Sequence, residues 1–238
     1  GSSWGANTST LRTGALALVF SAAEYAAPAW CRSAHTGKLD IPLNETMRII
    51  TGCLRATPSE LLPVLAGIAP AALRREYHTS KLVNKAILDH NHPLHSLVQN
   101  AQQGRQRLPS RRPFSRHAAK LKESNFNILD SWRARWQETT PPPQFTVCPN
   151  TMLPPGGELP RSTWVTLNRM RSGVGRFNHS MHRWGLRPSA ACVCGPADQT
   201  AHHIINECPI LRPPRDTMDL NNPNPPTVSW LHQLTGIA

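Results

Sequence analysis

Apolar residues recur at three- and four-residue intervals through positions 8–89, and no strand-like alternation interrupts them. This spacing places the apolar side chains on one face of a helix. Leu43, Met47 and Ile50 illustrate it, because they stand at i, i+4 and i+7. We therefore predict a compact helical bundle in this part of the chain. Its helices are expected at positions 8–25, 42–52, 59–66 and 70–89.

The first predicted helix is apolar nearly all round, so we expect it to be buried on several sides. A hydroxyl residue among positions 8–10 can cap its start, and Pro28 ends it. Residues 14–30 also resemble a signal peptide in their small and apolar composition. Glu24 interrupts that run, which is too short and too polar to span a membrane. A buried helix is the preferred interpretation.

The rest of the chain is polar, basic and rich in proline, with shorter helical patterns. Residues 90–122 are predicted to form a linker or a weakly helical arm. Residues 139–160 contain seven prolines and are predicted to form a loop without a core. Short helices are expected at positions 127–138, 162–172, 177–186 and 228–235. The predicted fold class is mainly α.

The formal net charge of +12 is concentrated in the middle of the chain. Positions 101–187 hold 15 Lys and Arg against 4 Asp and Glu. Such an excess indicates a polyanionic partner, with nucleic acid ahead of an anionic membrane. A solvated linker is the alternative explanation for the first group of these cations. That group forms a predicted phosphate-binding arm of Arg105, Arg107, Arg111, Arg112, Arg116, Lys120 and Lys122.

Four further arginines are predicted to form a second phosphate-binding patch, namely Arg169, Arg171, Arg176 and Arg183. Four aromatic side chains lie among them and could stack on bases, namely Trp164, Phe177, His182 and Trp184. Ordinary core packing is the alternative for these aromatic residues. If about six of the cations contact phosphate, the log–log dependence of affinity on salt should have a slope on the order of −4 to −5.

The most specific local pattern is a cluster of three cysteines and a histidine near the end of the chain. Cys192, Cys194, His203 and Cys208 are predicted to bind zinc, which prefers four sulfur and nitrogen ligands in a tetrahedron. This closed ligand set predicts a structural metal, whose binding would contribute about 10–16 kcal/mol to folding. Three unrelated thiols are the alternative. The spacing alone does not distinguish His202 from His203 as the ligand.

This cluster resembles the C-terminal CCHC zinc knuckle of LINE-type, or non-LTR, retrotransposon reverse transcriptases. That knuckle has four residues between its His and its last Cys and usually a following Pro, which matches His203, Cys208 and Pro209 and favours His203 over His202. Further stretches resemble the thumb-like region of jockey-like members of this family and the helices that lead into the knuckle. They are residues 4–30, residues 43–53 with the LLPVLAGIAPAALRR stretch that follows, and residues 164–186.

The resemblance implies four parts: a helical thumb-like domain (1–98), a basic and Pro-rich linker with a short helix (99–160), linker helices with the knuckle (161–212) and a tail (213–238). It also implies RNA and DNA partners, namely template RNA and target DNA, and no membrane. The expected location is intracellular, in the nucleus and in cytoplasmic ribonucleoprotein.

The enzyme of this family is an RNA-directed DNA polymerase, but its catalytic signature is absent from this sequence. There is no Y-x-D-D motif and no adjacent pair of acidic residues. Because two-metal catalysis needs converging carboxylates, we assign no catalytic residue and expect no activity from this chain alone. Mg²⁺ is expected only in the missing palm. The alternative function is a domesticated zinc-binding scaffold for protein interactions.

Overall fold

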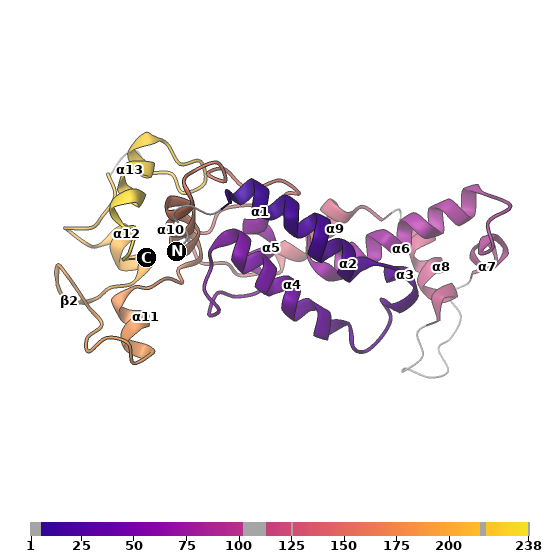
Figure 1. Cartoon of the computed structure of the whole chain (residues 1–238), viewed down its shortest axis with the longest axis horizontal. Helices are drawn as coiled ribbons and strands as arrows, with labels where there is room; N and C mark the ends of the chain where they lie inside the picture. The colour runs from indigo at the N-terminus through magenta and orange to yellow at the C-terminus, as the bar shows by residue number, and fades with distance from the viewer. Residues whose placement is uncertain (1–5, 102–112, 125, 215–217, 238) are drawn as a thin grey trace. The chain divides into compact units, whose positions relative to one another are not determined.

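The computed structural model describes residues 6–101, 113–124, 126–214 and 218–237. It is mainly helical, which confirms the predicted fold class (Figure 1). The chain divides into two compact units, and each is assembled from stretches that are distant in the sequence. The first unit takes its described residues from 1–15, 44–68 and 139–238, and the second takes them from 16–43 and 69–138.

The helices and strands follow one another along the chain with short connections. Among the described residues, none of the helices combines the length and the apolar character that crossing a membrane requires. The elements are α1 (Thr8–Gly14), the π-helix η1 (Ala15–Phe20), α2 (Ser21–Glu24), α3 (Ala27–Trp30), α4 (Thr36–Thr51), α5 (Leu61–Ala66), α6 (Ala71–Leu88), α7 (His95–Gln99), α8 (Phe114–Ser124), α9 (Ile128–Gln137), α10 (Arg161–Ser172), α11 (Asn178–Arg183), β1 (Ala191–Cys192), β2 (Gly195–Asp198), α12 (Ala201–Asn206) and α13 (Pro225–Gln233).

The first helical stretch differs from its prediction at both ends. Asn7 caps α1 by accepting a hydrogen bond on its side chain, so the cap lies before the predicted hydroxyl residues. The helical path breaks at Ala26, which has a positive φ of 51°. Pro28 stands in the first turn of α3, a position where proline is favoured. Burial on several sides is wrong, because Leu18 is 74% exposed while Phe20 is fully buried.

The helix α4 contains Pro42 in its interior, although the sequence predicted that the helix would begin there. A proline removes its own N–H from the helix, so one hydrogen bond is lost while the helix continues on both sides. The predicted apolar face is confirmed, because Leu43, Met47 and Ile50 are all buried. Gly52 ends the helix with a φ of 72°.

Side chains of α10 satisfy the last carbonyl groups of α4. These carbonyls have no partner inside their own helix. Arg161 donates to the oxygens of Ile49 and Ile50, and the indole of Trp164 also donates to Ile50 at 3.1 Å. Asn168 donates to Thr51 at 2.9 Å, and Arg169 donates to Gly52 at 3.2 Å. The two arginines also place positive charge at the negative end of the helix dipole.

A second buried arginine of α10 joins the long loop to the C-terminal segment. Arg171 is fully buried and donates to the carbonyl oxygens of Leu220 at 2.8 Å, Pro155 at 2.9 Å and Asn221 at 3.3 Å. Desolvation lowers its pKa to about 10, and the charge of Asp219 opposes that change. The guanidinium is therefore charged at neutral pH and is held by carbonyl dipoles.

One apolar core in the first unit supports the cysteine cluster. It gathers α10, α12 and α13, and α13 lies beside α10 (Figure 1). The segment predicted as a tail contributes four residues to it, so this segment packs against the knuckle helices. The buried members of the core are Trp164, Leu167, Met170, Phe177, Ala201, Ile204, Leu220, Trp230, Leu231 and Leu234.

The segment predicted to be a linker or weakly helical arm is partly packed. Its described residues include α7 and α8, and α8 lies against α6. Ala118, Ala119 and Leu121 are buried on one face of α8. Val83 of α6 and Val98 of α7 belong to the same apolar cluster as Ala118. Small residues on α8 thus let a strongly polar helix pack closely.

We predict that Gly67→Ala destabilises the protein more than Gly185→Ala. Both glycines have left-handed φ values, 61° and 73°, and alanine there costs about 1–2 kcal/mol. A Cβ on Gly67 would also clash with the carbonyl of Met152, whereas one on Gly185 would meet nothing within 4 Å. The clash should cost a further 1–3 kcal/mol or so. Urea unfolding measures both losses, and equal losses would contradict the prediction.

Candidate metal centre

A short hairpin and a short helix carry the four predicted metal ligands. The antiparallel strands β1 and β2 place Cys192 opposite Gly195, whose φ of 145° suits glycine in the connecting turn. Thr200 caps α12, because its side-chain oxygen accepts a hydrogen bond from the backbone N–H of His203 at 3.1 Å. Cys208 follows two residues after the end of α12. The hairpin and the helix therefore present their ligands toward the same point.

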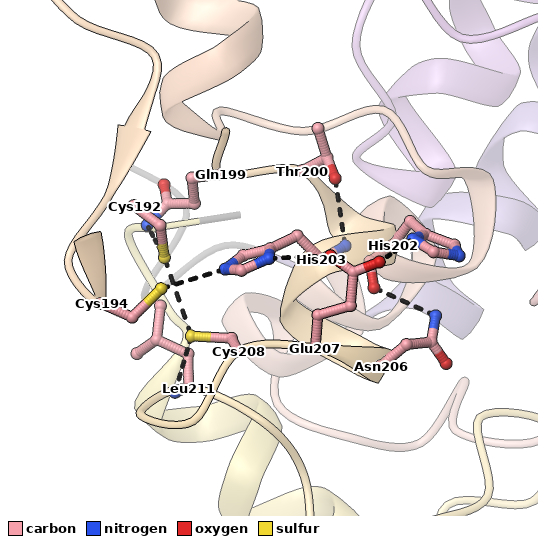
Figure 2. A network of polar contacts seen from close by, with 10 residues as sticks. All are labelled: Cys192, Cys194, Gln199, Thr200, His202, His203, Asn206, Glu207, Cys208 and Leu211. Carbon is pink, nitrogen blue, oxygen red and sulfur yellow. Dashed lines mark hydrogen bonds and ion pairs between the residues drawn. The ribbon is translucent and has the colours of Figure 1, made fainter. Parts of the chain in front are cut away.

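The four side chains converge, as the spacing predicted (Figure 2). Their ligand atoms all lie within 4.8 Å of one another. The sulfur atoms of Cys192 and Cys208 are 3.7 Å apart, and the sulfur of Cys194 lies 3.2 Å from Nε2 of His203. Zinc–sulfur bonds of about 2.3 Å at tetrahedral angles separate two sulfurs by about 3.8 Å. The cluster could therefore hold a metal such as zinc.

The structure brings His203, and not His202, to this cluster. The side chain of His203 is 8% exposed, whereas that of His202 is 64% exposed. Figure 2 shows the ring of His202 directed away from the three sulfurs. Nδ1 of His203 lies 3.2 Å from Oε2 of Glu207, which leaves Nε2 to face Cys194.

Glu207 was not predicted as part of the site. A carboxylate that accepts the second ring N–H of a metal-binding histidine fixes the orientation of the ring and makes it a stronger ligand. The i+4 spacing of His203 and Glu207 on a helix was the sequence signal for this contact. Gln199 adds a second supporting contact, because its side-chain nitrogen lies 3.9 Å from the sulfur of Cys192.

The protonation of the thiols depends on their mutual proximity. Desolvation raises the pKa of Cys194 to about 11, and the neighbouring thiols of Cys192 and Cys208 raise it further toward that value. Desolvation also acts upward on Cys208, but backbone N–H groups of Leu211 and Ile210 outweigh it and lower its pKa to about 7. Three thiolates this close repel one another. When bound, a zinc ion supplies the positive charge and four bonds that link the hairpin to α12.

Only part of the predicted arm lies in the described structure. Arg105, Arg107, Arg111 and Arg112 lie outside the described residues. Arg116, Lys120 and Lys122 stand on α8, where Lys120 and Lys122 are exposed. Lys122 donates to the backbone and side-chain oxygens of Gln99, both at 3.4 Å.

The predicted second patch separates into buried and exposed arginines. Arg171 is fully buried, and Arg169 is half-buried and donates to Gly52. Desolvation lowers the pKa of Arg169, and the positive charge of Arg176 lowers it further. Arg176 and Arg183 are both exposed. The structure therefore places two of the four arginines on the surface of the first unit.

The predicted aromatic residues separate in the same way. Trp164 and Phe177 are fully buried in the apolar core, which confirms core packing for these two side chains. Trp184 is 40% exposed, and His182 is also exposed. Arg187 was not predicted but is exposed near them, and its carbonyl lies 3.0 Å from Nδ1 of His182.

Comparison with known proteins gives two relatives. No family model matches the chain, and no solved structure matches it. The chain is 25% identical over 226 residues to the Retrovirus-related Pol polyprotein from type-1 retrotransposable element R1 4 of Nasonia vitripennis, which covers 90% of this chain and 52% of that protein. It is 26% identical over 98 residues to the corresponding R1 polyprotein of Bradysia coprophila, which covers 40% of this chain and 9% of that protein.

These similarities support an origin in a non-LTR retrotransposon. The chain spans about half the length of the first relative and about a tenth of the second. Both relatives are R1 elements, so the jockey-like type stays a prediction. The identification of the cysteine cluster as the zinc knuckle of the family also stays a prediction.

We predict that His203→Ala abolishes stoichiometric zinc binding and that His202→Ala preserves it. The two histidines are neighbours of the same chemistry, but only His203 faces the sulfur atoms. Zinc content can be measured by elemental analysis of the purified full chain. The wild type and His202→Ala should hold about one zinc per chain. Equal zinc contents in the two variants would show that His203 is not a ligand.

Proposed function

We propose that this chain is the nucleic-acid-binding C-terminal part of a non-LTR retrotransposon RNA-directed DNA polymerase, without the catalytic palm. The observation that carries the proposal is the convergence of Cys192, Cys194, His203 and Cys208. These residues lie in a chain that is similar over 90% of its length to an R1 Pol polyprotein. In this proposal the cluster is a structural zinc knuckle, and the partners are template RNA and target DNA.

A cationic surface adjoins the cysteine cluster and supports nucleic-acid binding. It consists of four exposed side chains on and around α11, namely Arg176, His182, Arg183 and Trp184. Arginine side chains bind phosphate through paired hydrogen bonds, and an exposed indole offers a stacking face to an unpaired base. We name this set the α11 surface. Its composition is typical of single-stranded nucleic-acid binding.

The α11 surface is connected to the hairpin that carries the first two cysteines. The side-chain nitrogen of Asn178 donates to the carbonyl of Ala191 at 2.7 Å. Nδ1 of His179 lies 2.8 Å from Oδ2 of Asp198. Gln199 accepts a hydrogen bond from the backbone N–H of Asn178 at 3.0 Å. A change in the hairpin would therefore be transmitted to α11, so we expect metal and nucleic-acid binding to be coupled.

The chain supplies binding and no chemistry in this proposal. Its sequence contains no Y-x-D-D motif and no adjacent acidic pair, so it has no candidate for the two-metal site of a polymerase. The catalytic aspartates and their Mg²⁺ ions would belong to a palm domain of the parent protein. A second group of cations on α8, with Lys120 and Lys122 exposed, would add phosphate contacts.

A zinc-stabilised scaffold for protein interactions is the second candidate. Three large apolar side chains around the cysteine cluster are exposed, and their exposed fractions are 65% for Leu186, 62% for Val193 and 62% for Ile210. Exposed apolar side chains grouped in this way favour a protein partner. This function needs no phosphate contact, so it predicts that the charge of α11 is unimportant.

We predict that replacing Arg176 and Arg183 together by Gln weakens binding of single-stranded RNA and flattens its salt dependence. Each lost phosphate contact should reduce the log–log slope by about 0.7. Fluorescence anisotropy of a labelled oligonucleotide at several salt concentrations measures both effects. The matched control replaces Arg55 and Arg133, two exposed arginines away from the α11 surface, and removes the same charge.

The control variant should bind nearly as tightly as the wild type. Equal losses in the two double variants would remove the α11 surface from the proposal, and a wild-type affinity that does not change with salt would exclude phosphate binding altogether. Either result would favour the scaffold. Removal of zinc by a chelator should weaken binding in the wild type, because α11 is hydrogen-bonded to the metal-binding hairpin.

A further inference from the structure

The second unit contains a cavity that the proposed function does not use. Its volume is about 500 Å³, which is within the range of small-molecule sites. The turn after α3, the start of α4, one face of α6 and one face of α8 enclose it. The residues that line it are Cys31, Arg32, Thr36, Ala72, Arg75, Glu76, Pro113, Arg116, His117 and Lys120.

The lining of this cavity is strongly positive. Four cationic side chains line it, and Glu76 is the one carboxylate among the described residues that do so. Oε1 of Glu76 lies 3.6 Å from a guanidinium nitrogen of Arg135, so part of its charge is already compensated. Arg75 is held by Asp40 through two hydrogen bonds, of 2.6 Å and 3.2 Å. The remaining positive charge comes from the turn after α3 and from α8.

The guanidinium of Arg32 is fixed in place without a carboxylate contact in the described structure. It donates to the carbonyl oxygens of Pro28 at 2.7 Å and of Ala29 at 3.3 Å. It also lies over the ring of Phe114, 5.3 Å from the ring centre. These neutral groups orient the side chain but do not cancel its charge. A cation held in this way is prepared to bind an anion with little further loss of side-chain freedom.

The face of α8 contributes three polar residues to the cavity. Arg116 and Lys120 stand four residues apart, so their side chains lie on the same face of the helix. His117 lies between them in the sequence, and its Nδ1 is buried without a hydrogen-bond partner among the described residues. Desolvation lowers the pKa of His117, and the charge of Arg32 lowers it further. A buried polar nitrogen without a partner is uncommon in a finished structure and indicates a partner that is absent.

We propose that this cavity binds a phosphate-bearing ligand of the size of a single nucleotide. The arginine and lysine side chains match the charge and the acceptor oxygens of a phosphate group. The volume exceeds what a phosphate group alone requires, so a sugar and a base can be accommodated beside it. Glu76 offers acceptor oxygens for the hydroxyl groups of a ribose. The inference does not rest on the proposed function, because the cysteine cluster and the α11 surface belong to the other unit.

Isothermal titration calorimetry of the full chain with AMP and with adenosine tests this inference. We expect AMP to bind in a saturable manner, inorganic phosphate to compete with it, and adenosine to bind at least tenfold more weakly. Lys120→Gln should weaken AMP binding about tenfold. The matched control is Lys85→Gln, an exposed lysine of the same unit that does not line the cavity. Circular dichroism checks that both variants remain folded.

The source of the nucleotide is distinguished by competition with a labelled single-stranded oligonucleotide. Displacement of the oligonucleotide by AMP would place one nucleotide of a strand in the cavity. Binding of AMP without displacement would assign the cavity to a free nucleotide, and it would stand even if the chain bound no strand at all. AMP and adenosine of equal affinity, or equal effects of Lys120→Gln and Lys85→Gln, would overturn the inference.

Discussion

The first unit depends on hydrogen bonds from α10 to the C-terminal end of α4. The last carbonyls of a helix need partners from outside it, and an unsatisfied buried carbonyl costs roughly 1–3 kcal/mol. Arg161, Trp164, Asn168 and Arg169 supply these partners from one side of α10. The same solution recurs at α5, where Arg12 donates to the carbonyls of Ala66 and Gly67. Stretches far apart in the sequence are joined in this way without any carboxylate.

The position of α10 in turn determines where the metal ligands lie. Trp164 and Leu167 pack in the same core as Ile204 of α12 and Trp230 of α13. Because Ile204 is fully buried, the neighbouring His203 is held at the edge of that core, where Nε2 meets the sulfur of Cys194. The indole of Trp230 donates to the carbonyl of Leu211 at 2.7 Å, three residues after Cys208. The core therefore fixes the helical half of the site, and the hairpin brings the other two ligands to it.

The sequence was sufficient for features that depend on local spacing. The buried face of Leu43, Met47 and Ile50 followed from helical periodicity, and the convergence of the cysteines with His203 followed from their separation along the chain. Features that depend on distant partners were not accessible. Burial of Leu18 was predicted because the helix is apolar all round, yet apolar composition does not reveal which faces receive a neighbour. Pro42 marked a helix start by its usual preference, but the surrounding contacts allowed the helix to continue through it.

The arginines show most clearly why charge alone could not locate the candidate surfaces. Arg169, Arg171, Arg176 and Arg183 are indistinguishable by composition, and all four were predicted to contact phosphate. In the structure Arg171 is used inside the protein as a five-donor group that satisfies carbonyls, and Arg169 also donates to one. A guanidinium suits that role because it stays protonated even where desolvation lowers its pKa to about 10, as at Arg171. Part of the net charge of +12 is thus spent on internal structure. The cations that remain exposed are fewer and more localised, and their positions on α8 and α11 are what any anionic partner would meet.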